Sequence, residues 1–191
     1  MSALQNERIA ILATDGFEEV ELTEPARVLG AAGAKVDIIA PHEGRIQAFK
    51  HHDKSITVPV DHTIEQARPE EYDALVLPGG ALNADEMRTR PEVQRFVHHF
   101  ADAGKPMAAI CHAPWELVSS DLVRGRTLTS WPTLQDDVRN AGGTWVDREV
   151  VVDGNLVTSR GPHDLPAFNR EMVKLFASRR REANPGQSTN R

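Results

Sequence analysis

Apolar and polar positions follow two alternating patterns along the chain. Short apolar runs, typical of buried strands, occupy residues 8–13, 35–41, 72–80 and 105–111. Segments with the spacing of amphipathic helices occupy residues 23–33, 91–103 and 113–120. Strands that alternate with helices are typical of a mostly parallel sheet that is covered by helices on both faces. The pattern therefore predicts one doubly wound α/β domain.

Several predicted elements carry residues that favour their ends. The first helix is expected to begin at Thr23, with Pro25 in its first turn, and to end at Gly33. Asp153-Gly154 stands between two apolar runs and predicts a hairpin near the C-terminus. In the last predicted helix, one face carries the apolar side chains of Leu165, Phe168, Met172, Leu175 and Phe176.

Composition places the chain among ordinary globular proteins, with 40% hydrophobic and 26% charged residues. Residues 7–177 are expected to form a single domain, and residues 178–191, which lack apolar periodicity, a mobile tail. The net charge of -6 disfavours nucleic acid or an anionic membrane as the main partner. No apolar stretch approaches the ~18 residues that span a bilayer. With one cysteine and no signal-peptide layout, the chain is interpreted as cytoplasmic.

The single cysteine, Cys111, stands where a buried strand turns sharply into a helix, in the stretch AAICHAP. Ligands of doubly wound sheets gather at the carboxyl ends of the strands, and a strand–nucleophile–helix elbow exposes its side chain there. Donors at the helix N-terminus are expected to lower the pKa of the thiol below ~8.5. Position alone leaves an alternative, an inert core cysteine.

Two other strand ends add to this hypothesis. The turn in LPGG brings Gly79 and Gly80 near the same crevice, where their backbone N–H groups could face an oxyanion. The stretch TDGFEEVEL follows the first strand, so Glu18 or Glu19 could reach the thiol. An acid, a Gly-Gly turn and a Cys-His pair at three strand ends together favour a catalytic cysteine.

Four stretches together resemble the PfpI-type intracellular peptidase family: DGFEEVELTEP, YDALVLPGG, MAAICHAPWELV and LVTSRGPHDLPAF. This family belongs to a superfamily that includes the Parkinson-associated deglycase and the class I glutamine amidotransferases. The resemblance implies a flavodoxin-like sandwich with Cys111 as the nucleophile and His112 beside it. It also implies that Glu18 contacts the cysteine and that the N–H groups of Gly80 and His112 form the oxyanion site.

The resemblance further implies that a third catalytic group comes from a second subunit, shortly after the Pro-Gly-Gly turn. Asp85 matches this position, and Glu86 is the near alternative. A homo-oligomer is therefore expected, a dimer or a larger assembly such as a hexamer. His163 stands in PHD where relatives often have PDD; it is interpreted as a loop residue before the final helix, with a titratable group near the site as the alternative.

Other classes of site lack their motifs. His51, His52 and Asp53 are adjacent, and neighbours in an extended strand point to opposite faces, so no metal site is expected. HExxH, CxxC, GxGxxG and GxSxG spacings do not occur, so no cofactor is expected either. The His-x-Glu motif of the class I glutamine amidotransferases is also absent downstream of Cys111, because His163 is followed by Asp-Leu.

Three functions remain open for the same site. The thiolate could attack a reactive aldehyde such as methylglyoxal, or an early glycation adduct, through a hemithioacetal. It could instead cleave peptides through an acyl-enzyme, or serve as a redox sensor that is oxidised to sulfenic or sulfinic acid. A histidine directly after an elbow nucleophile is expected to point away from the sulfur, which disfavours efficient proteolysis. Aldehyde chemistry in stress protection is therefore preferred.

Overall fold

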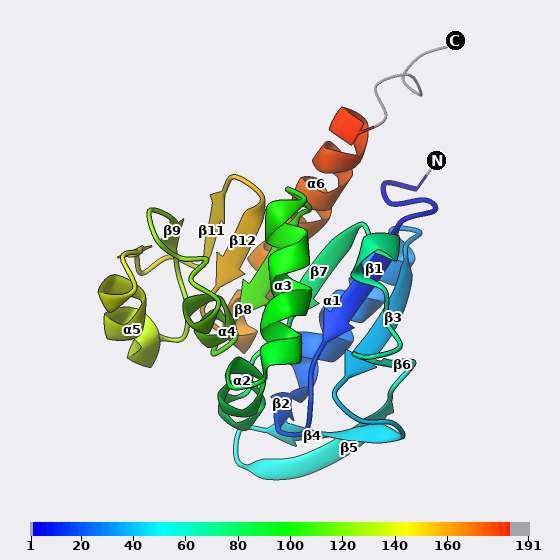
Figure 1. Cartoon of the computed structure of the whole chain (residues 1–191), viewed down its shortest axis with the longest axis horizontal. Helices are drawn as coiled ribbons and strands as arrows, with labels where there is room; N and C mark the ends of the chain where they lie inside the picture. Colours follow the sequence, from blue (N-terminus) through cyan, green and yellow to red (C-terminus); the bar gives the residue numbers. More distant parts are fainter. Residues whose placement is uncertain (1, 184–191) are drawn as a thin grey trace.

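The computed structural model describes residues 2–183, which fold around one seven-stranded sheet. The strands lie in the order β11 (Val150–Asp153), β12 (Leu156–Ser159), β8 (Met107–Ile110), β7 (Ala74–Leu77), β1 (Arg8–Leu12), β3 (Lys35–Ala40) and β6 (His62–Thr63). All neighbouring strands run parallel except β11, which is antiparallel to β12. The carboxyl ends of the central strands therefore meet at one edge of the sheet, at the lower end of Figure 1.

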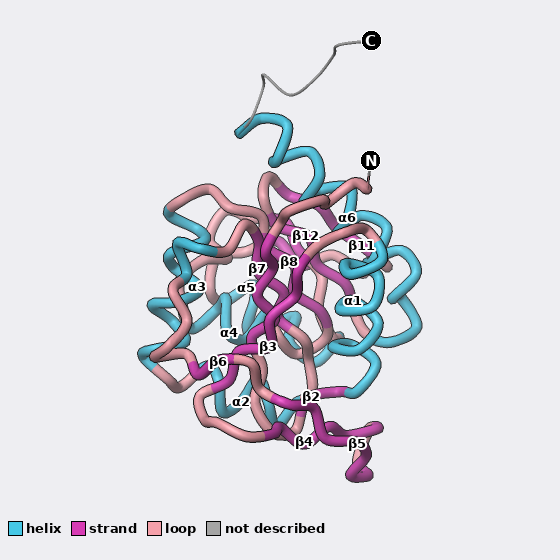
Figure 2. The backbone as a smooth tube through the Cα atoms, turned by 90° about the vertical axis from the view of Figure 1, so that its right-hand side faces the viewer, coloured by secondary structure: helices cyan, strands magenta, loops and turns pink. Residues whose placement is uncertain are grey.

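Helices cover both faces of this sheet, as Figure 2 shows. One face carries α1 (Glu19–Ala31) and α6 (Leu165–Ala183), which contact each other. The other face carries α2 (Ala81–Arg88), α3 (Pro91–Asp102), α4 (Pro114–Ser119) and α5 (Gln135–Asn140). Short 3-10 helices occupy Pro69–Glu71, Pro132–Leu134 and Pro162–Asp164. The predicted doubly wound α/β class is confirmed.

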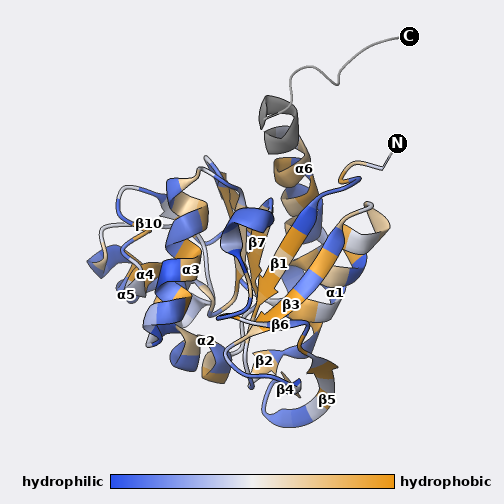
Figure 3. Ribbon diagram, turned by 45° about the vertical axis from the view of Figure 1, so that its right-hand side comes forward, coloured by the Kyte–Doolittle hydropathy of each residue, from blue (hydrophilic) through white to orange (hydrophobic). Residues whose placement is uncertain are grey.

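Successive side chains along each strand point to opposite faces of the sheet, which divides the hydrophobic core into two layers. In β1, Ile9 and Ile11 pack toward α1 and α6, whereas Ala10 and Leu12 pack toward α3. Both faces of the sheet are thus removed from water, which accounts for the nearly continuous apolar runs in the sequence. These strands form the hydrophobic centre in Figure 3. No helix among the described residues is long and apolar enough to cross a bilayer.

Two small sheets lie outside the central one. The first joins β2 (Phe17–Glu18), β4 (Arg45–Lys50) and β5 (Asp53–Pro59), and the second pairs β9 (Thr127–Leu128) with β10 (Thr144–Trp145). Strands β4 and β5 form a hairpin at the end of the molecule opposite the last turns of α6 (Figure 1). Along the chain, the hairpin lies between β3 and β6.

The structure corrects one predicted boundary and extends another. Helix α1 begins at Glu19, so Thr23 is not its N-cap; the Thr23 hydroxyl donates to the Glu19 carbonyl inside the helix. The hairpin β11–β12 and the buried face of α6 are confirmed. Helix α6 continues to Ala183, beyond the predicted boundary at residue 177, and the rest of the expected tail lies outside the described residues.

Candidate active site

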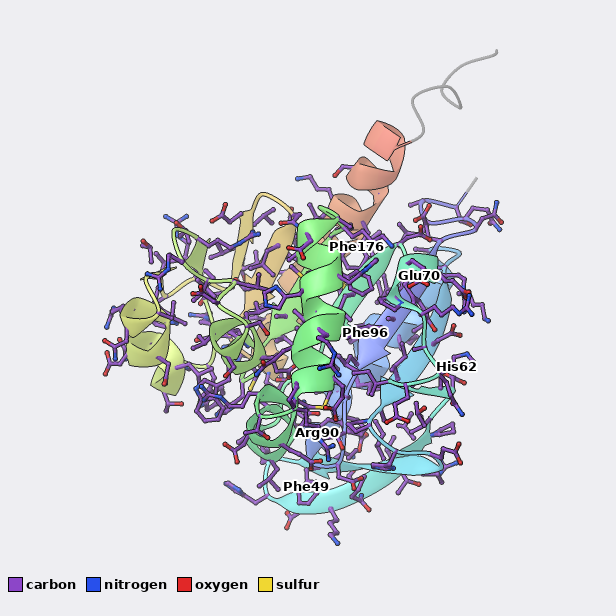
Figure 4. The ribbon with its side chains drawn as sticks, in the orientation of Figure 1. Phe49, His62, Glu70, Arg90, Phe96 and Phe176 are labelled. Carbon is purple, nitrogen blue, oxygen red and sulfur yellow. The ribbon has the colours of Figure 1, made fainter. Side chains whose placement is uncertain are left out.

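A pocket of about 500 Å³ opens at the carboxyl ends of β1, β7 and β8. Its lining includes Cys111 and His112 after β8, Gly80 after β7, and Glu18 and Glu21 at the start of α1. Figure 4 shows Phe49 and Arg90 at this end of the molecule, near the β4–β5 hairpin and α2. Three strand ends thus converge on one crevice, as the sequence indicated.

The backbone of Cys111 forms a strained elbow between β8 and α4. Its φ angle is +64°, in a left-handed region that side chains other than glycine seldom occupy. The Cys111 N–H donates to the Ser159 carbonyl over 3.0 Å, and its own carbonyl accepts from the Trp131 N–H over 2.8 Å. Such conformations persist where the surrounding structure fixes them, and they cluster at active sites. The elbow therefore presents the sulfur to the pocket while the residue stays only 6% exposed.

Glu21, and not Glu18, is the acid that contacts the thiol. Glu21 is fully buried in the first turn of α1, its carboxyl lies against the Cys111 sulfur, and it accepts the Gly79 N–H over 3.0 Å. The Glu18 carboxylate instead accepts the N–H of His51, also over 3.0 Å. One helical turn separates the two acids, and the early start of α1 brings the second of them inward.

The backbone N–H groups of the two glycines in the Pro-Gly-Gly turn have different partners. The N–H of Gly79 is occupied by Glu21, so Gly79 does not serve an oxyanion as expected. The N–H groups of Gly80 and His112 face the sulfur instead. A Cβ at Gly79 would collide with Cys111 and Glu21, and Gly80 has a φ of +94°. Glycine is therefore required at both positions for the turn to approach the nucleophile.

Burial sets the protonation of the Glu21–Cys111 pair. It raises the pKa of Glu21 to about 8, and the charge of Glu18 acts in the same direction. Burial and the charge of Glu21 raise the pKa of the Cys111 thiol, against the N–H groups of Gly80 and His112. The expected lowering is wrong, because loss of water outweighs the donors at the end of a helix of 6 residues. Groups this close titrate as one unit, so the first ionisation belongs to the pair.

The imidazole of His112 points toward the sulfur, contrary to expectation. Its Nδ1 lies 3.2 Å from the Cys111 Sγ. The ring stacks on Trp131 with centroids 5.7 Å apart and meets the edge of Trp115 at 5.4 Å. Burial lowers the pKa of His112, so the ring is neutral at pH 7. The two tryptophans thus hold a neutral proton carrier beside the nucleophile.

The remaining candidates lie outside this cluster. Asp85 is exposed on α2, and its carboxylate has no hydrogen-bonding partner among the described residues. Its alternative, Glu86, forms an ion pair with Arg90 over 2.6 Å. His163 is exposed in the 3-10 helix before α6, 3.4 Å from the Asp164 carboxylate. No group of three metal-ligating side chains occurs among residues 2–183.

Sequence reasoning missed two buried acids. Glu21 falls on the stripe that buries Leu22, Pro25 and Leu29, so the helical spacing could have found it. Glu116, in the first turn of α4, is 1% exposed, and neither of its carboxyl oxygens has a partner among the described residues. Burial raises the pKa of Glu116 well above its ordinary value. Nothing in its local sequence distinguishes it from a surface acid.

Comparison with known proteins identifies the family. The model of the DJ-1/PfpI family matches residues 7–175. The chain belongs to the DJ-1/PfpI family. The resemblance to PfpI-type proteins that the motifs indicated is thereby confirmed.

Relatives of the family carry two kinds of name. The chain is 44% identical over 174 residues to protein/nucleic acid deglycase 2 of Escherichia coli (strain K12), covering 91% of this chain and 99% of that protein. It is 39% identical over 171 residues to YraA of Bacillus subtilis (strain 168), provisionally named a cysteine protease, covering 90% and 99%. Deglycase and peptidase, the two activities weighed from the sequence, are thus both represented among DJ-1/PfpI relatives.

Solved structures of the DJ-1/PfpI family share the fold. A two-domain protein of Anabaena variabilis, with DJ-1/ThiJ/PfpI-like and ferritin-like domains, superposes with a TM-score of 0.84 at 32% identity. The match covers 97% of this chain and 52% of that protein, so the chain spans about half the length of this two-domain relative. The flavodoxin-like sandwich implied by the motifs is confirmed.

Proposed function

We propose that the protein is a cysteine-dependent enzyme of stress protection that acts on reactive aldehydes or early glycation adducts, as a glyoxalase or deglycase of the cytoplasm. The observation that carries this proposal is the environment of Cys111. A buried acid, two backbone N–H groups and a neutral imidazole surround one sulfur at a pocket. The deglycase name of the Escherichia coli relative supports the same substrates.

The first step forms a bond between sulfur and carbon. The reactive form of the singly ionised pair is the one in which Glu21 holds the shared proton and Cys111 the negative charge. The thiolate attacks the aldehyde carbon of methylglyoxal, and the carbonyl oxygen takes up the electron pair and then the proton of Glu21. The N–H groups of Gly80 and His112 stabilise the charge that develops. The product is a hemithioacetal; with an amine adduct, the carbon–nitrogen bond breaks and the departing amine takes the proton instead.

The second step moves a proton within the bound intermediate. A base, the Glu21 carboxylate or the His112 imidazole, removes the proton from the carbon bonded to sulfur. The neighbouring carbonyl carbon receives a proton, and the proton of the hemithioacetal hydroxyl passes to the former carbonyl oxygen, which leaves a thioester of lactate. Water hydrolyses this thioester, releases lactate and restores the thiolate. No cofactor is required, because the overall reaction adds only water.

Turnover of methylglyoxal to lactate tests this proposal against hydrolysis of casein. We expect lactate from the wild-type protein, at a rate well above casein cleavage, and no lactate from Cys111→Ser. Lysozyme pre-treated with methylglyoxal serves as the substrate for deglycation. Casein cleavage without lactate formation would contradict the proposal and favour a peptidase.

A cysteine peptidase is the second candidate, and the position of His112 favours it. With Nδ1 3.2 Å from the sulfur, the imidazole can act as the general base of an acyl-enzyme mechanism. The third candidate, a redox sensor, uses the same thiolate without turnover. Oxidation of Cys111 by peroxide in a protein that turns over neither methylglyoxal nor casein would identify it.

We infer that the protein assembles as a homodimer or a larger oligomer in which Asp85 of one subunit reaches His112 of another. Asp85 is exposed and unpartnered among the described residues, whereas Glu86 is held by Arg90. His112 forms a hydrogen bond through Nδ1, and no acid of the described chain bonds its second ring nitrogen. Such an acid would fix the tautomer of the imidazole.

Light scattering and complementation test this assembly. We expect a mass of at least twice 21.1 kDa. Mixing inactive Cys111→Ser subunits with inactive Asp85→Ala subunits should restore activity, because a mixed dimer has one intact site. A monomer, or no restored activity after subunit exchange has been verified, would remove the shared site.

A further inference from the structure

Glu18 lines the wall of the pocket and does not contact the Cys111 sulfur. The side chain is half-buried at the end of β2, and it lines the same pocket as Cys111. Its carboxylate accepts the N–H of His51, the first turn residue of the β4–β5 hairpin, over 3.0 Å. The contact leaves the negative charge of Glu18 intact, since a backbone N–H is a dipole and not a cation. Glu18 therefore faces the pocket as a charged group.

The hairpin has other anchors that do not depend on this charge. The Gly16 N–H donates to the Gln47 carbonyl over 2.8 Å, and the Gln47 N–H donates to the Asp15 carboxylate over 2.6 Å. Glu19 forms an ion pair with Lys50 over 3.5 Å and also binds the Ser55 hydroxyl. The wall of the pocket is thus held by several bonds, and removal of the Glu18 charge alone leaves most of them in place.

No lysine or arginine compensates the charge of Glu18. The described lining has neither residue type; its imidazoles besides His112 are those of His51 and His52, and Glu18 forms no ion pair with them or with any other side chain within residues 2–183. The second acid of the lining, Glu21, is protonated below a pKa of about 8, and burial lowers the pKa of His112. Glu18 therefore places a negative charge at the entrance to Cys111.

We propose that Glu18 selects substrates by charge, admitting neutral and cationic carbonyl compounds to Cys111 and disfavouring anionic ones such as 2-oxo acids. The inference rests on the proposed function in one respect, that Cys111 is the reacting group. A carboxylate repels an anionic substrate and attracts a cationic one by similar amounts. A walled pocket concentrates this effect at the nucleophile.

Methanethiosulfonate reagents test the selectivity without any catalytic turnover. A cationic trimethylammonium-ethyl reagent and an anionic sulfonato-ethyl reagent carry out the same thiol chemistry, and Cys111 is the only cysteine they can label. Rates are measured for both at one pH. Glu18→Gln keeps an oxygen that can accept the His51 N–H but removes the charge. We expect the cation-to-anion rate ratio to fall about tenfold, as for one unit charge several ångströms away in a water-filled pocket.

Glu19→Gln is the matched control. It removes the same charge from the adjacent residue, which does not line the pocket, and it weakens the hairpin contacts to Lys50 and Ser55. The ratio should change less than about twofold in this variant, because salt and water screen a charge outside the pocket. An unchanged ratio in Glu18→Gln, or an equal change in Glu19→Gln, would overturn the proposal.

A second measurement separates this proposal from the proposed function. The kcat/KM for neutral phenylglyoxal is compared with that for its anionic 4-carboxyl derivative, because both have the aldehyde and adjacent ketone that the proposed reaction needs. Glu18→Gln should raise the relative value for the anionic compound several-fold. If the protein turns over neither compound but the reagent ratio still shifts, the aldehyde activity fails and the charge selection stands. Turnover of both with an unshifted preference and reagent ratio would leave the activity and remove the selection.

Discussion

Replacing Glu116 by leucine should stabilise the protein and change how its stability depends on pH. The Glu116 carboxyl is 1% exposed, both of its oxygens lack a partner among the described residues, and burial holds its pKa well above the ordinary value. The folded protein therefore keeps a proton on Glu116 at pH values where the unfolded chain, with a pKa of about 4.5, has already lost it. Leucine removes a polar group that is costly to bury without a hydrogen bond.

Proton linkage gives the sign and size of the pH dependence of the unfolding free energy. Between the unfolded and folded pKa values, unfolding releases one proton, so the free energy of unfolding falls as the pH rises. The loss is about 1.4 kcal/mol per pH unit for one group. Between those two pKa values, the advantage of Glu116→Leu over wild type should therefore grow with pH, by up to this amount per pH unit. Glu21, whose pKa is also raised, contributes the same slope to both proteins and cancels in the comparison.

Urea denaturation at pH 5.5, 6.5 and 7.5 measures this difference. The m value should stay constant, which would show that the variant changes stability and not the denatured state. Glu116→Gln is the control, because it removes the titrating group but keeps a buried polar side chain. Its plot of unfolding free energy against pH should run parallel to that of Glu116→Leu, at lower values. A stability difference between wild type and leucine that does not vary with pH would refute the reasoning.

Three further outcomes are expected from the site. Glu21→Gln should change the shape of the pH profile of Cys111 alkylation by iodoacetamide and the rate of its oxidation by peroxide, because the pair loses its shared proton. Glu18→Gln should keep the shape of the profile and move it to lower pH, because the charge of Glu18 raises the pKa of Glu21. Gly79→Ala should lower lactate formation more than tenfold, since a Cβ there collides with Cys111; activity near the wild-type value would contradict the close approach of the turn. Trp131→Ala should lower kcat and shift the NMR titration of His112 toward the ordinary value, as the ring gains water, and an unmoved titration would assign its pKa to other neighbours.

The fold and the nucleophile could be predicted because they depend on local pattern. Apolar runs that alternate with helical segments determine the sheet, and a lone cysteine at a strand end stands out whatever surrounds it. The acid partner depends on the phase of α1, which begins at Glu19 and not at Thr23. That shift of one turn decides between Glu18 and Glu21, and the capping preference of a threonine was a poor guide to it.

The electrostatics of the site could not be predicted from the elbow alone. The helix N-terminus favours a thiolate, but the depth of the pocket depends on walls that come from distant segments, including β2 and the β4–β5 hairpin. Only the assembled structure shows that burial outweighs the donors at Cys111. The partner of Asp85 lies on another chain in our proposal, so no pattern within one sequence could locate it.

The dispersal of the site along the chain has a consequence for folding. Glu21, Gly80 and Cys111 come from three segments that meet only after β1, β7 and β8 have paired in parallel. Parallel pairing joins residues far apart in sequence, so it is slow and comes late. Until then the cysteine is an ordinary exposed thiol, open to oxidants and to other chains. The rate at which Cys111 loses its reactivity toward thiol reagents during refolding therefore reports when the sheet is complete. A newly made chain is open to oxidation at Cys111 until the pocket has formed around it.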